Sequence, residues 1–317
     1  MSRRVLISGS VAYDTIMVFE GHFKDHILPD RVHMLNVSFL APKLKREYGG
    51  CAANIAYNLN GLGGNAVVLA TIGRDGGDYL ARLASLGIDV SQVRTLEDRY
   101  TAQAFITTDL SDNQLSAFHP GAMSDAHAVS AASAQRAGEP AAFGIVAPNG
   151  RDAMLQHARE FTEAGVPWIF DPGQGLPMFD GEALRAFVSS ATAVTVNDYE
   201  ASLLVERTGW SEPQIAERVQ ALIVTRGAHG SRVYEPGRMT EVPPAAISRA
   251  VDPTGCGDAY RGGVLFALAN GADWVDAARL GSVMGAIKIE HQGPQNHRID
   301  RDEVARRCVQ AYGRAPW

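Results

Sequence analysis

Several features that mark large classes of protein are scarce or missing in this sequence of 317 residues. The three cysteines, Cys51, Cys256 and Cys308, are odd in number and far apart, which excludes a disulfide framework and a zinc site. No block of Lys or Arg is long enough to follow a nucleic-acid backbone, and the formal net charge is −6. We therefore expect a small-molecule substrate and no DNA or RNA partner.

Long apolar runs are also missing. After Arg3 and Arg4, the apolar segment 5–7 is too short for a signal peptide or a membrane span, which predicts a cytoplasmic protein that does not bind membranes. Three nucleotide-binding signatures are absent as well: the GxxxxGK[ST] P-loop, the HRD loop of protein kinases and a GxGxxG motif after the first strand. These absences exclude the corresponding nucleotide-binding classes.

Short runs rich in Val and Ile alternate with segments of helical periodicity, which is typical of repeated βα units and a parallel sheet. The expected strands are residues 5–8, 66–72, 143–147, 168–171, 193–196 and 222–225. Expected helices over 53–62, 77–86 and 152–164 each end at a glycine, where the chain can turn out of the helix. The pattern predicts an α/β fold.

Two segments, 17–48 and 100–123, interrupt this alternation. They carry strand-like patches at 104–108 and 115–118 around a Ser-Asp-Asn turn and lack a clear helical period. They predict a small β-sheet inserted into a single domain over residues 1–317, placed as a lid over the C-terminal ends of the strands. A surface hairpin without function is the alternative.

The motif DPTGCGD at residues 252–258 points most directly to a reaction. Gly255 and Gly257 flank Cys256 just before an expected helix, where free backbone N–H groups and the positive end of the helix dipole attract anions. Asp258 stands at the inner edge of this cradle, where its carboxylate can accept a proton from a hydroxyl group. The motif therefore predicts phosphoryl transfer.

Two other interpretations of this motif stay open. Asp is a preferred residue for capping a helix N-terminus, so Asp258 can serve only that purpose. Cys256 is a conceivable nucleophile at a helix start that lowers its pKa, although no His partner is evident nearby.

Polar residues near the N-terminus suit a sugar. Asp14 follows the first strand, so we expect its carboxylate at the C-terminal edge of the sheet, where it can accept hydrogen bonds from two adjacent hydroxyls. A loop aspartate bonded to its own backbone is the alternative. Gly49 and Gly50 open the next helix and let a ligand approach the backbone, while Asn54 offers both a donor and an acceptor.

Two further strand ends suit a nucleotide. Asn197 and Glu200 lie three residues apart on one expected helical face, a pair that suits Mg²⁺ bound through water, with an exposed surface Glu as the alternative. Thr225, Gly227 and Gly230 form a turn whose N–H groups can meet phosphates, with a plain hairpin turn as the alternative.

Together these residues resemble the ribokinase-like (phosphofructokinase B type) carbohydrate kinase family over nearly the whole chain. The positions that carry the resemblance are Asp14, Gly49, Gly50, Asn54, Gly73, Asp75, Asn197, Glu200, Thr225, Gly227, Gly230 and the segment 252–258. The resemblance implies a doubly wound, mostly parallel sheet flanked by helices, with a β-sheet lid, ATP and Mg²⁺ as cofactors, and transfer of the γ-phosphate to a primary hydroxyl.

The resemblance also implies roles for single residues. Asp258 would be the base, the backbone of Gly255, Cys256 and Gly257 the anion hole, and Asp14 a ligand of sugar hydroxyls. Gly257 would also contact the nucleotide, together with the predicted residues at the two strand ends. Where this chain has Cys256 the family more often has alanine, and a hole made of backbone N–H groups tolerates the thiol at the cost of sensitivity to oxidation.

A monovalent cation such as K⁺ is a further implication of the resemblance. Members of the family hold it beside the anion hole, and its ligands would fall on Asp252, Thr254 and the backbone near Gly293.

The segments DPGQ at 171–174 and EHQGPQNH at 290–297 look most like those of prokaryotic nucleoside and adenosine kinases. Gln103 and Phe105 of the expected lid are candidate substrate contacts. Apolar lid residues that can flank a purine, with core packing as the alternative, are Met34, Phe39, Phe105, Phe118 and Met123. We therefore expect a purine nucleoside kinase acting on adenosine, inosine or guanosine, with a ribokinase or another sugar kinase as the alternative.

Two rivals belong to other classes. An inactive nucleoside-binding or regulatory protein can share the fold, because fold does not determine function. A nucleoside phosphorylase or hydrolase is the second rival and differs in not consuming ATP. A homodimer is compatible with the sequence, which does not decide how many chains associate.

Overall fold

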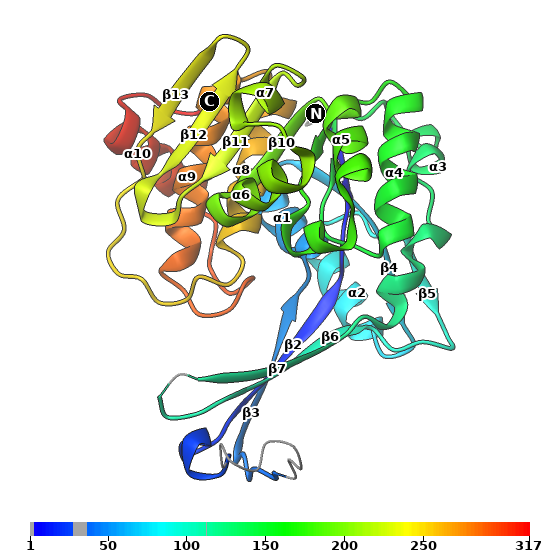
Figure 1. Cartoon of the computed structure of the whole chain (residues 1–317), viewed down its shortest axis with the longest axis vertical. Coiled ribbons are helices and arrows are strands. Elements are labelled where there is room, and N and C mark those ends of the chain that lie inside the picture. The colour runs from blue at the N-terminus through cyan, green and yellow to red at the C-terminus, as the bar shows by residue number, and fades with distance from the viewer. Residues whose placement is uncertain (1–2, 28–36, 112) are drawn as a thin grey trace.

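The computed structural model describes residues 3–27, 37–111 and 113–317. Its centre is a sheet of nine strands in the order β13-β12-β11-β10-β9-β8-β1-β4-β5 (Figure 1). The strands are β1 (Arg4–Ser8), β4 (Asn65–Gly73), β5 (Val93–Leu96), β8 (Phe143–Val146), β9 (Trp168–Phe170), β10 (Ala193–Asn197), β11 (Ala221–Thr225), β12 (Ser231–Glu235) and β13 (Arg238–Val242). All six strands expected from the sequence are present, and each end differs from the expected one by at most one residue.

The sheet is parallel from β11 to β5, and only β12 and β13 are added antiparallel at one edge. From β1 the chain builds the sheet in two directions, first through β4 and β5 and later through β8 to β11. In such doubly wound sheets ligands bind outside the carboxyl ends of the strands where the direction reverses. Here that place lies between β1 and β8, which agrees with the expected fold class.

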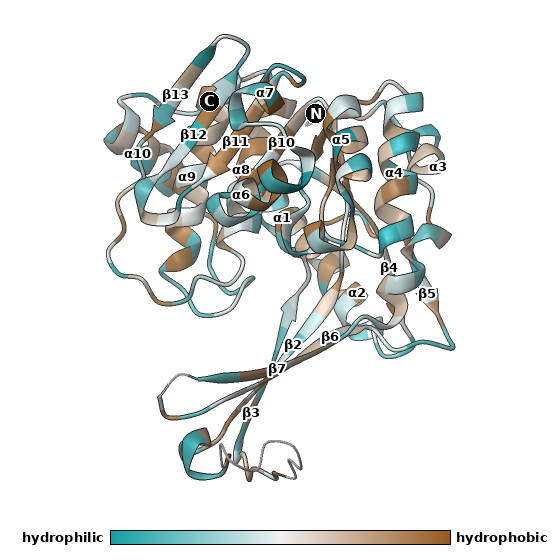
Figure 2. Ribbon diagram, viewed as in Figure 1, coloured by the Kyte–Doolittle hydropathy of each residue, from teal (hydrophilic) through white to brown (hydrophobic). Residues whose placement is uncertain are grey.

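Helices cover both faces of this sheet. One layer contains α1 (Cys51–Gly61), α2 (Gly77–Ser85), α8 (Cys256–Ala269), α9 (Trp274–Ile289) and α10 (Arg301–Tyr312), and the other contains α3 (Ala131–Arg136), α4 (Arg151–Glu163), α5 (Gly181–Ser190), α6 (Asp198–Thr208) and α7 (Glu212–Ala216). Alternate residues of β1 supply the two cores, since Val5 and Ile7 pack in the first layer and Leu6 in the second. In Figure 2 the central strands are mainly hydrophobic, whereas the outer helices carry hydrophilic bands.

Two glycines determine where α8 lies. A Cβ at Gly262 would stand 3.0 Å from the Ile55 carbonyl oxygen of α1, and one at Gly263 would stand 3.0 Å from the Gly281 Cα of α9. Glycine at these positions lets α8 approach both neighbours closely. The start of α8, with the DPTGCGD motif, is therefore held against α1 and α9.

A second sheet of four strands, in the order β3-β2-β6-β7, extends from the body (Figure 1). Its strands are β2 (Ala12–Val18), β3 (Lys43–Gly49), β6 (Ala102–Thr108) and β7 (Gln114–His119). The sheet begins at Ala12, before the expected start at residue 17, so Asp14 lies in a strand and not in a loop. Four paired strands also make it more than a surface hairpin. Met34 and the middle of the turn after β6, Asp112, lie outside the described residues.

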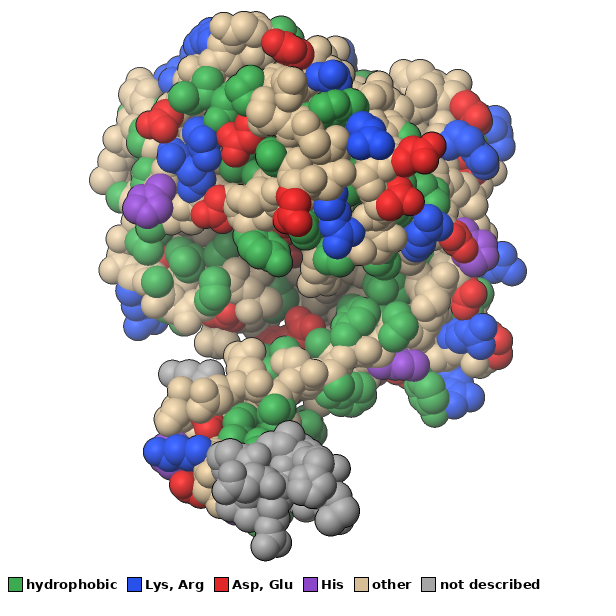
Figure 3. Space-filling model, viewed as in Figure 1, with side chains coloured by type: hydrophobic (Ala, Val, Ile, Leu, Met, Phe, Trp, Pro, Cys, Tyr) green, Lys and Arg blue, Asp and Glu red, His purple; other side chains and the backbone are tan. Residues whose placement is uncertain are grey.

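The space-filling view shows a hollow between the body and the second sheet, with acidic side chains visible inside it (Figure 3). In the described part of the chain, no helix combines the length and the apolar character that crossing a membrane requires.

Candidate active site

The first turn of α8 holds the predicted base. The helix begins at Cys256, inside the motif and not after it, and its N-cap is Gly255 with φ of 80°. The interpretation of Asp258 as the helix cap is therefore wrong. Its carboxylate instead accepts a hydrogen bond from Asn54 Nδ2 at 2.8 Å, across from α1. Burial raises the pKa of Asp258, while the Asn54 hydrogen bond and the Arg261 charge partly oppose that rise.

Two of the three N–H groups expected in the anion hole are free to bind an anion. The Cys256 N–H donates to the Pro253 carbonyl oxygen at 3.1 Å. The N–H groups of Gly255 and Gly257 have no hydrogen-bond acceptor among the described residues. Gly255 is required there because a Cβ would stand 2.7 Å from Pro294 Cβ. The anion hole therefore has two free N–H donors and not the three expected from the sequence, because the Cys256 N–H is already bound to Pro253.

The Cys256 thiol does not suit a nucleophile. Burial raises its pKa to about 11, so the thiol stays protonated at neutral pH, and only a thiolate is strongly nucleophilic. Its closest partner is the Asp252 carbonyl oxygen at 3.8 Å. The structure therefore favours the anion-hole interpretation of the motif over a nucleophilic Cys256.

Asp14 of β2 lies at the same site. Burial, together with the negative charges of Asp258, Glu47 and Asp252, raises the pKa of Asp14 to about 6. A Cβ at Gly49 would stand 2.6 Å from Asp14 Oδ2, so this glycine makes room for the carboxylate. Two acids more than 200 positions apart are thereby brought together.

The glycine pair and Asn54 close the site on the side of α1. Gly50 is the N-cap of α1 with φ of 90°. Asn54 is buried, and its Oδ1 accepts from Gln295 Nε2 at 2.9 Å while Nδ2 donates to Asp258. Asn54 therefore holds the carboxylate of Asp258. The sequence had suggested instead that its amide would be free to contact a substrate.

The second sheet places the expected substrate contacts on two different faces. Paired residues on neighbouring strands share a face, and successive residues alternate. Asp14 pairs with Ala104, which pairs with Phe118, so these three share one face. Gln103 and Phe105 lie on the opposite face, where Gln103 donates a hydrogen bond to Thr15. Of the lid residues named from the sequence, Phe118, which is 50% exposed, shares the face of Asp14, whereas Gln103 and Phe105 do not.

Phe39 and Met123, two other apolar residues expected in the lid, lie outside the strands of the second sheet. Phe39 packs against Phe19 and Phe23 with ring centroids 4.8 and 4.9 Å apart, as expected for core packing. Met123 lies in the short helix η3 (Gly121–Ala128), outside the four strands.

Asn197 and Glu200 form a capping box at the start of α6. Asn197 Oδ1 accepts from the Glu200 N–H at 2.7 Å, and Glu200 Oε2 accepts from the Asn197 N–H at 2.8 Å. The Glu200 side chain is only 13% exposed and lies 3.9 Å from Arg261, so the alternative of an exposed surface Glu is wrong. Among the described residues, no group of three or more His, Cys, Asp or Glu side chains forms a ready metal site.

The segment after β11 is a tight connection to the antiparallel strand β12. Thr225 pairs with Ser231 across it, and the Arg226 N–H donates to the Gly230 carbonyl oxygen at 2.7 Å. Gly227 and Gly230 both have positive φ, of 53° and 76°. The segment is thus a hairpin connection, and it leaves the exposed Gly227 beside the carboxyl ends of β10 and β11.

A buried pair of charges that the sequence analysis missed lies behind Asp258. The guanidinium of Arg261 contacts Asp171 directly, and both residues are buried. Burial raises the pKa of Asp171 to about 7, against the opposing charge of Arg261. Two signals could have found the pair: Arg261 lies three positions after Asp258 on the same helix, and Asp171 directly follows β9.

The three residues expected to bind a monovalent cation lie together around the Asp252 carboxylate. Asp252 Oδ1 accepts from the Thr254 N–H at 2.8 Å, and Oδ2 accepts from the Gly293 N–H at 2.7 Å. Burial opposes ionisation of Asp252, yet these hydrogen bonds and the Lys288 charge lower its pKa overall. Lys288 Nζ donates to the Asp252 carbonyl oxygen at 2.7 Å. No motif in the sequence pointed to Lys288.

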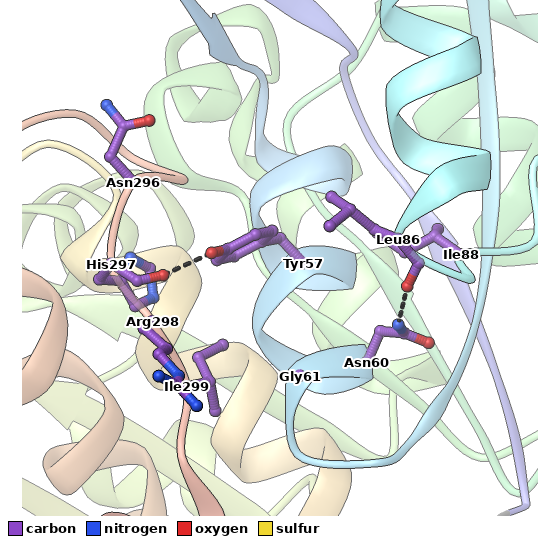
Figure 4. Close-up of a pocket in the computed structure, with 9 residues that line it drawn as sticks. All are labelled: Tyr57, Asn60, Gly61, Leu86, Ile88, Asn296, His297, Arg298 and Ile299. Carbon is purple, nitrogen blue, oxygen red and sulfur yellow. Dashed lines mark hydrogen bonds between the residues drawn. The ribbon is translucent and has the colours of Figure 1, made fainter.

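A pocket of about 340 Å³ lies on another side of α1 (Figure 4). Tyr57 and Asn60 of α1 line it, together with Leu86 and residues 296–299. In the close-up, Tyr57 donates to the His297 carbonyl oxygen and Asn60 Nδ2 donates to the Leu86 carbonyl oxygen at 2.6 Å. Neither Asp14 nor Asp258 lines this pocket, so it is separate from the acidic site.

Comparison with known proteins gives consistent matches over the whole chain. The pattern of the family described as pfkB family carbohydrate kinase matches residues 4–301. The nucleoside kinase of Methanocaldococcus jannaschii is 30% identical over 274 residues, covering 86% of this chain and 89% of that protein. The structure of Burkholderia thailandensis nucleoside kinase in complex with inosine is similar, with a TM-score of 0.87 and 50% identity over 98% of this chain and 99% of that chain. Its complex with ADP-inosine has a TM-score of 0.85 and 52% identity, covering 98% and 97% of the two chains.

Proposed function

Because the chain belongs to the pfkB family of carbohydrate kinases, we propose that it is an ATP-dependent nucleoside kinase that phosphorylates the 5′-hydroxyl of a purine nucleoside. One observation carries the proposal: Asp14 and Asp258 lie at one site beside the free N–H groups of Gly255 and Gly257. This one site can hold a polyol, remove a proton and bind a phosphate. The similarity to a nucleoside kinase solved with inosine supports the purine nucleoside.

Asp258 acts as the base in this proposal. Its carboxylate accepts the proton of the 5′-hydroxyl as the new bond forms between that oxygen and the γ-phosphorus, and the bond from the γ-phosphorus to the bridging oxygen of ADP breaks. Its raised pKa makes it a stronger base than an ordinary carboxylate. Asn54 keeps the carboxylate oriented. The N–H groups of Gly255 and Gly257, at the positive end of α8, stabilise the negative charge on the transferred phosphate.

Asp14 binds the substrate sugar. Its ionised carboxylate accepts hydrogen bonds from the two adjacent ribose hydroxyls, and bonds of this charged kind are the stronger ones. The second sheet that carries Asp14 serves as the lid of a single-domain enzyme, and Phe118 on the same face stacks on the base.

The nucleotide lies along the carboxyl ends of β10 and β11 in this proposal. Asn197, Thr225, Gly227 and Gly230 lie at or just after the ends of these two strands. Gly257, in the first turn of α8, would contact the phosphates from the other side. Mg²⁺ bound with ATP would neutralise phosphate charge. Glu200 suits a metal-bound water, because its hydrogen bond to Asn197 uses Oε2 and leaves Oε1 available.

Parallel steady-state assays of ADP release test the proposal. With ATP and Mg²⁺, we expect kcat/KM for inosine or adenosine to exceed that for D-ribose by on the order of 10³, because ribose lacks the base contacts that favour lid closure. Equal turnover of ribose or fructose would identify a sugar kinase instead. Loss of nucleoside without ATP consumption would identify a phosphorylase or hydrolase, and nucleoside binding without any turnover would identify a binding protein.

A further inference from the structure

Lys288 is a buried lysine at the last turn of α9, with 0% exposure. Lysine is almost never fully buried unless its charge is paired. Its Nζ donates to the Asp252 carbonyl oxygen at 2.7 Å and to the His291 carbonyl oxygen at 3.0 Å, and lies 3.9 Å from Asp252 Oδ2. One ammonium group therefore ties together the loop before α8 and the segment after α9.

The same loop is where the family resemblance placed a monovalent cation. The donor set does not fit one. The Asp252 carboxylate already accepts from the Thr254 and Gly293 N–H groups and, at 3.1 Å, from Gln292 Nε2. Near this carboxylate Gly293 therefore presents a donor and not an acceptor. The Asp252 carbonyl oxygen that remains is bound by Lys288.

Charge leads to the same conclusion. The Asp252 carboxylate and the Lys288 ammonium balance each other in a poorly hydrated place. A metal ion added here would lie against a fixed positive charge, and like charges repel strongly where water does not screen them.

We infer that the Lys288 ammonium takes the place of the monovalent cation, so that the anion hole of this enzyme is complete without K⁺. Lys288 is a positioning residue, because it touches the loop that presents Gly255 and Gly257 and not the substrate itself. The test of this inference by activity rests on the proposed kinase function. The test by cation binding, measured as thermal stability, does not.

The wild-type enzyme gives the first test. Its kcat/KM for inosine is measured with ATP and Mg²⁺ in KCl, NaCl or choline chloride at matched ionic strength. We expect the three values to agree within about twofold once ionic strength is equal. Activation by K⁺ of more than about fivefold, a size typical of coupled ligand sites, overturns the inference.

Substitution of Lys288 tests whether its ammonium group acts in place of a cation or has only a structural role. In choline chloride, K288M should lose activity by about 10–100-fold, as commonly follows the loss of a side chain that orients a functional group, and K⁺ or NH₄⁺ should restore much of it. K43M, which removes an exposed lysine charge from β3, should show no such activation by cations. Wild-type activity of K288M in choline overturns the inference. A loss in folded K288M that neither cation reduces also overturns it, and K288Q takes its place if K288M does not fold.

Thermal unfolding keeps the inference separate from the proposed function. If the wild type has no kinase activity in any salt, the proposed function fails, and the melting temperatures decide the inference alone. A ligand that binds only the folded state raises Tm. A rise of Tm with K⁺ relative to choline in the Lys288 variant but not in the wild type supports the inference, and any other pattern overturns it.

Discussion

The start of α8 and the second sheet contribute to the same site in opposite ways. At α8, Asp258 is held by Asn54, which is in turn held by Gln295, so the polar groups are positioned before any substrate arrives. In the second sheet, every described side chain of β7 is exposed. Under the proposed function, this difference predicts that the chemical step relies on a preorganised body, whereas substrate binding relies on the exposed second sheet.

This comparison predicts different kinetic signatures. Substitutions at the start of α8 should lower kcat, because they act on the transition state. Substitutions on the Asp14 face of the second sheet should mainly raise KM and alter selectivity.

The largest effect is expected for D258N. The amide keeps the shape of the side chain but cannot accept the proton, so kcat should fall by about 10²–10⁴-fold, the range typical of losing a general base. KM for the nucleoside should change little. D152N, on the exposed first turn of α4, is the matched control and should behave as wild type. If D258N kept more than about a tenth of the wild-type kcat, the role of Asp258 as base would be refuted.

The next largest effect is expected for D14A. The substitution removes two charge-assisted hydrogen bonds to ribose hydroxyls. At about 1.5 kcal/mol each, the lower end of their usual range, KM should rise by about 10²-fold with a smaller change in kcat. Discrimination against 2′-deoxynucleosides should disappear. Steady-state assays of paired ribo- and deoxynucleosides measure both, and a preference for the ribonucleoside that survives D14A contradicts this role.

The pH dependence of KM tests the role of Asp14 independently. With a pKa of about 6 in the folded enzyme, Asp14 takes up a proton as pH falls below that value and loses its negative charge. KM should therefore rise on the acid side in the wild type and stay flat in D14N.

The same ionisation of Asp14 that favours substrate binding should lower the stability of the folded enzyme. Since the pKa is raised on folding, the folded state binds the proton more tightly than the unfolded chain between about pH 4 and 6. Ionisation of Asp14 therefore lowers stability as pH rises through this window. The Tm of D14N relative to wild type should increase over the same range, and a constant difference contradicts the shift.

The smallest effect compares the two faces of the second sheet directly. F118A, on the face of Asp14, should raise KM for inosine by about tenfold, since stacking of a base on an aromatic ring contributes about 1–3 kcal/mol. F105A, on the opposite face and 40% exposed, is the matched control and should change KM by less than about twofold. Equal effects of the two substitutions would contradict the assignment of faces.

Much of the body was predictable from the sequence. The buried strands were visible as short Val- and Ile-rich runs, and the ends of α1, α2 and α4 were visible at glycines, because both signals are local. The boundaries were less exact, as at α8, where Cys256 and Gly257 carry no periodic apolar signal and yet belong to the helix.

The site was predictable as a set of residues but not as a set of contacts. Asp14 and Asp258 were found because each lies in a local motif. That Asn54 holds Asp258, that the Cys256 N–H is occupied and that Phe118 shares a face with Asp14 depend on the partner that another segment brings. The alternation of residues within one strand does not determine how it pairs with another strand, and therefore does not determine which side chains share a face.

The sequence by itself thus determined the α/β alternation, the Gly-rich helix start and the acids beside it, because dihedral preference, periodicity and motif chemistry belong to a few neighbouring residues. Only the tertiary structure decided that Lys288 would meet the Asp252 loop and that Arg261 would pair with Asp171. A buried charge is tolerated only where distant segments supply its partners, so its place depends on the packing of the whole chain.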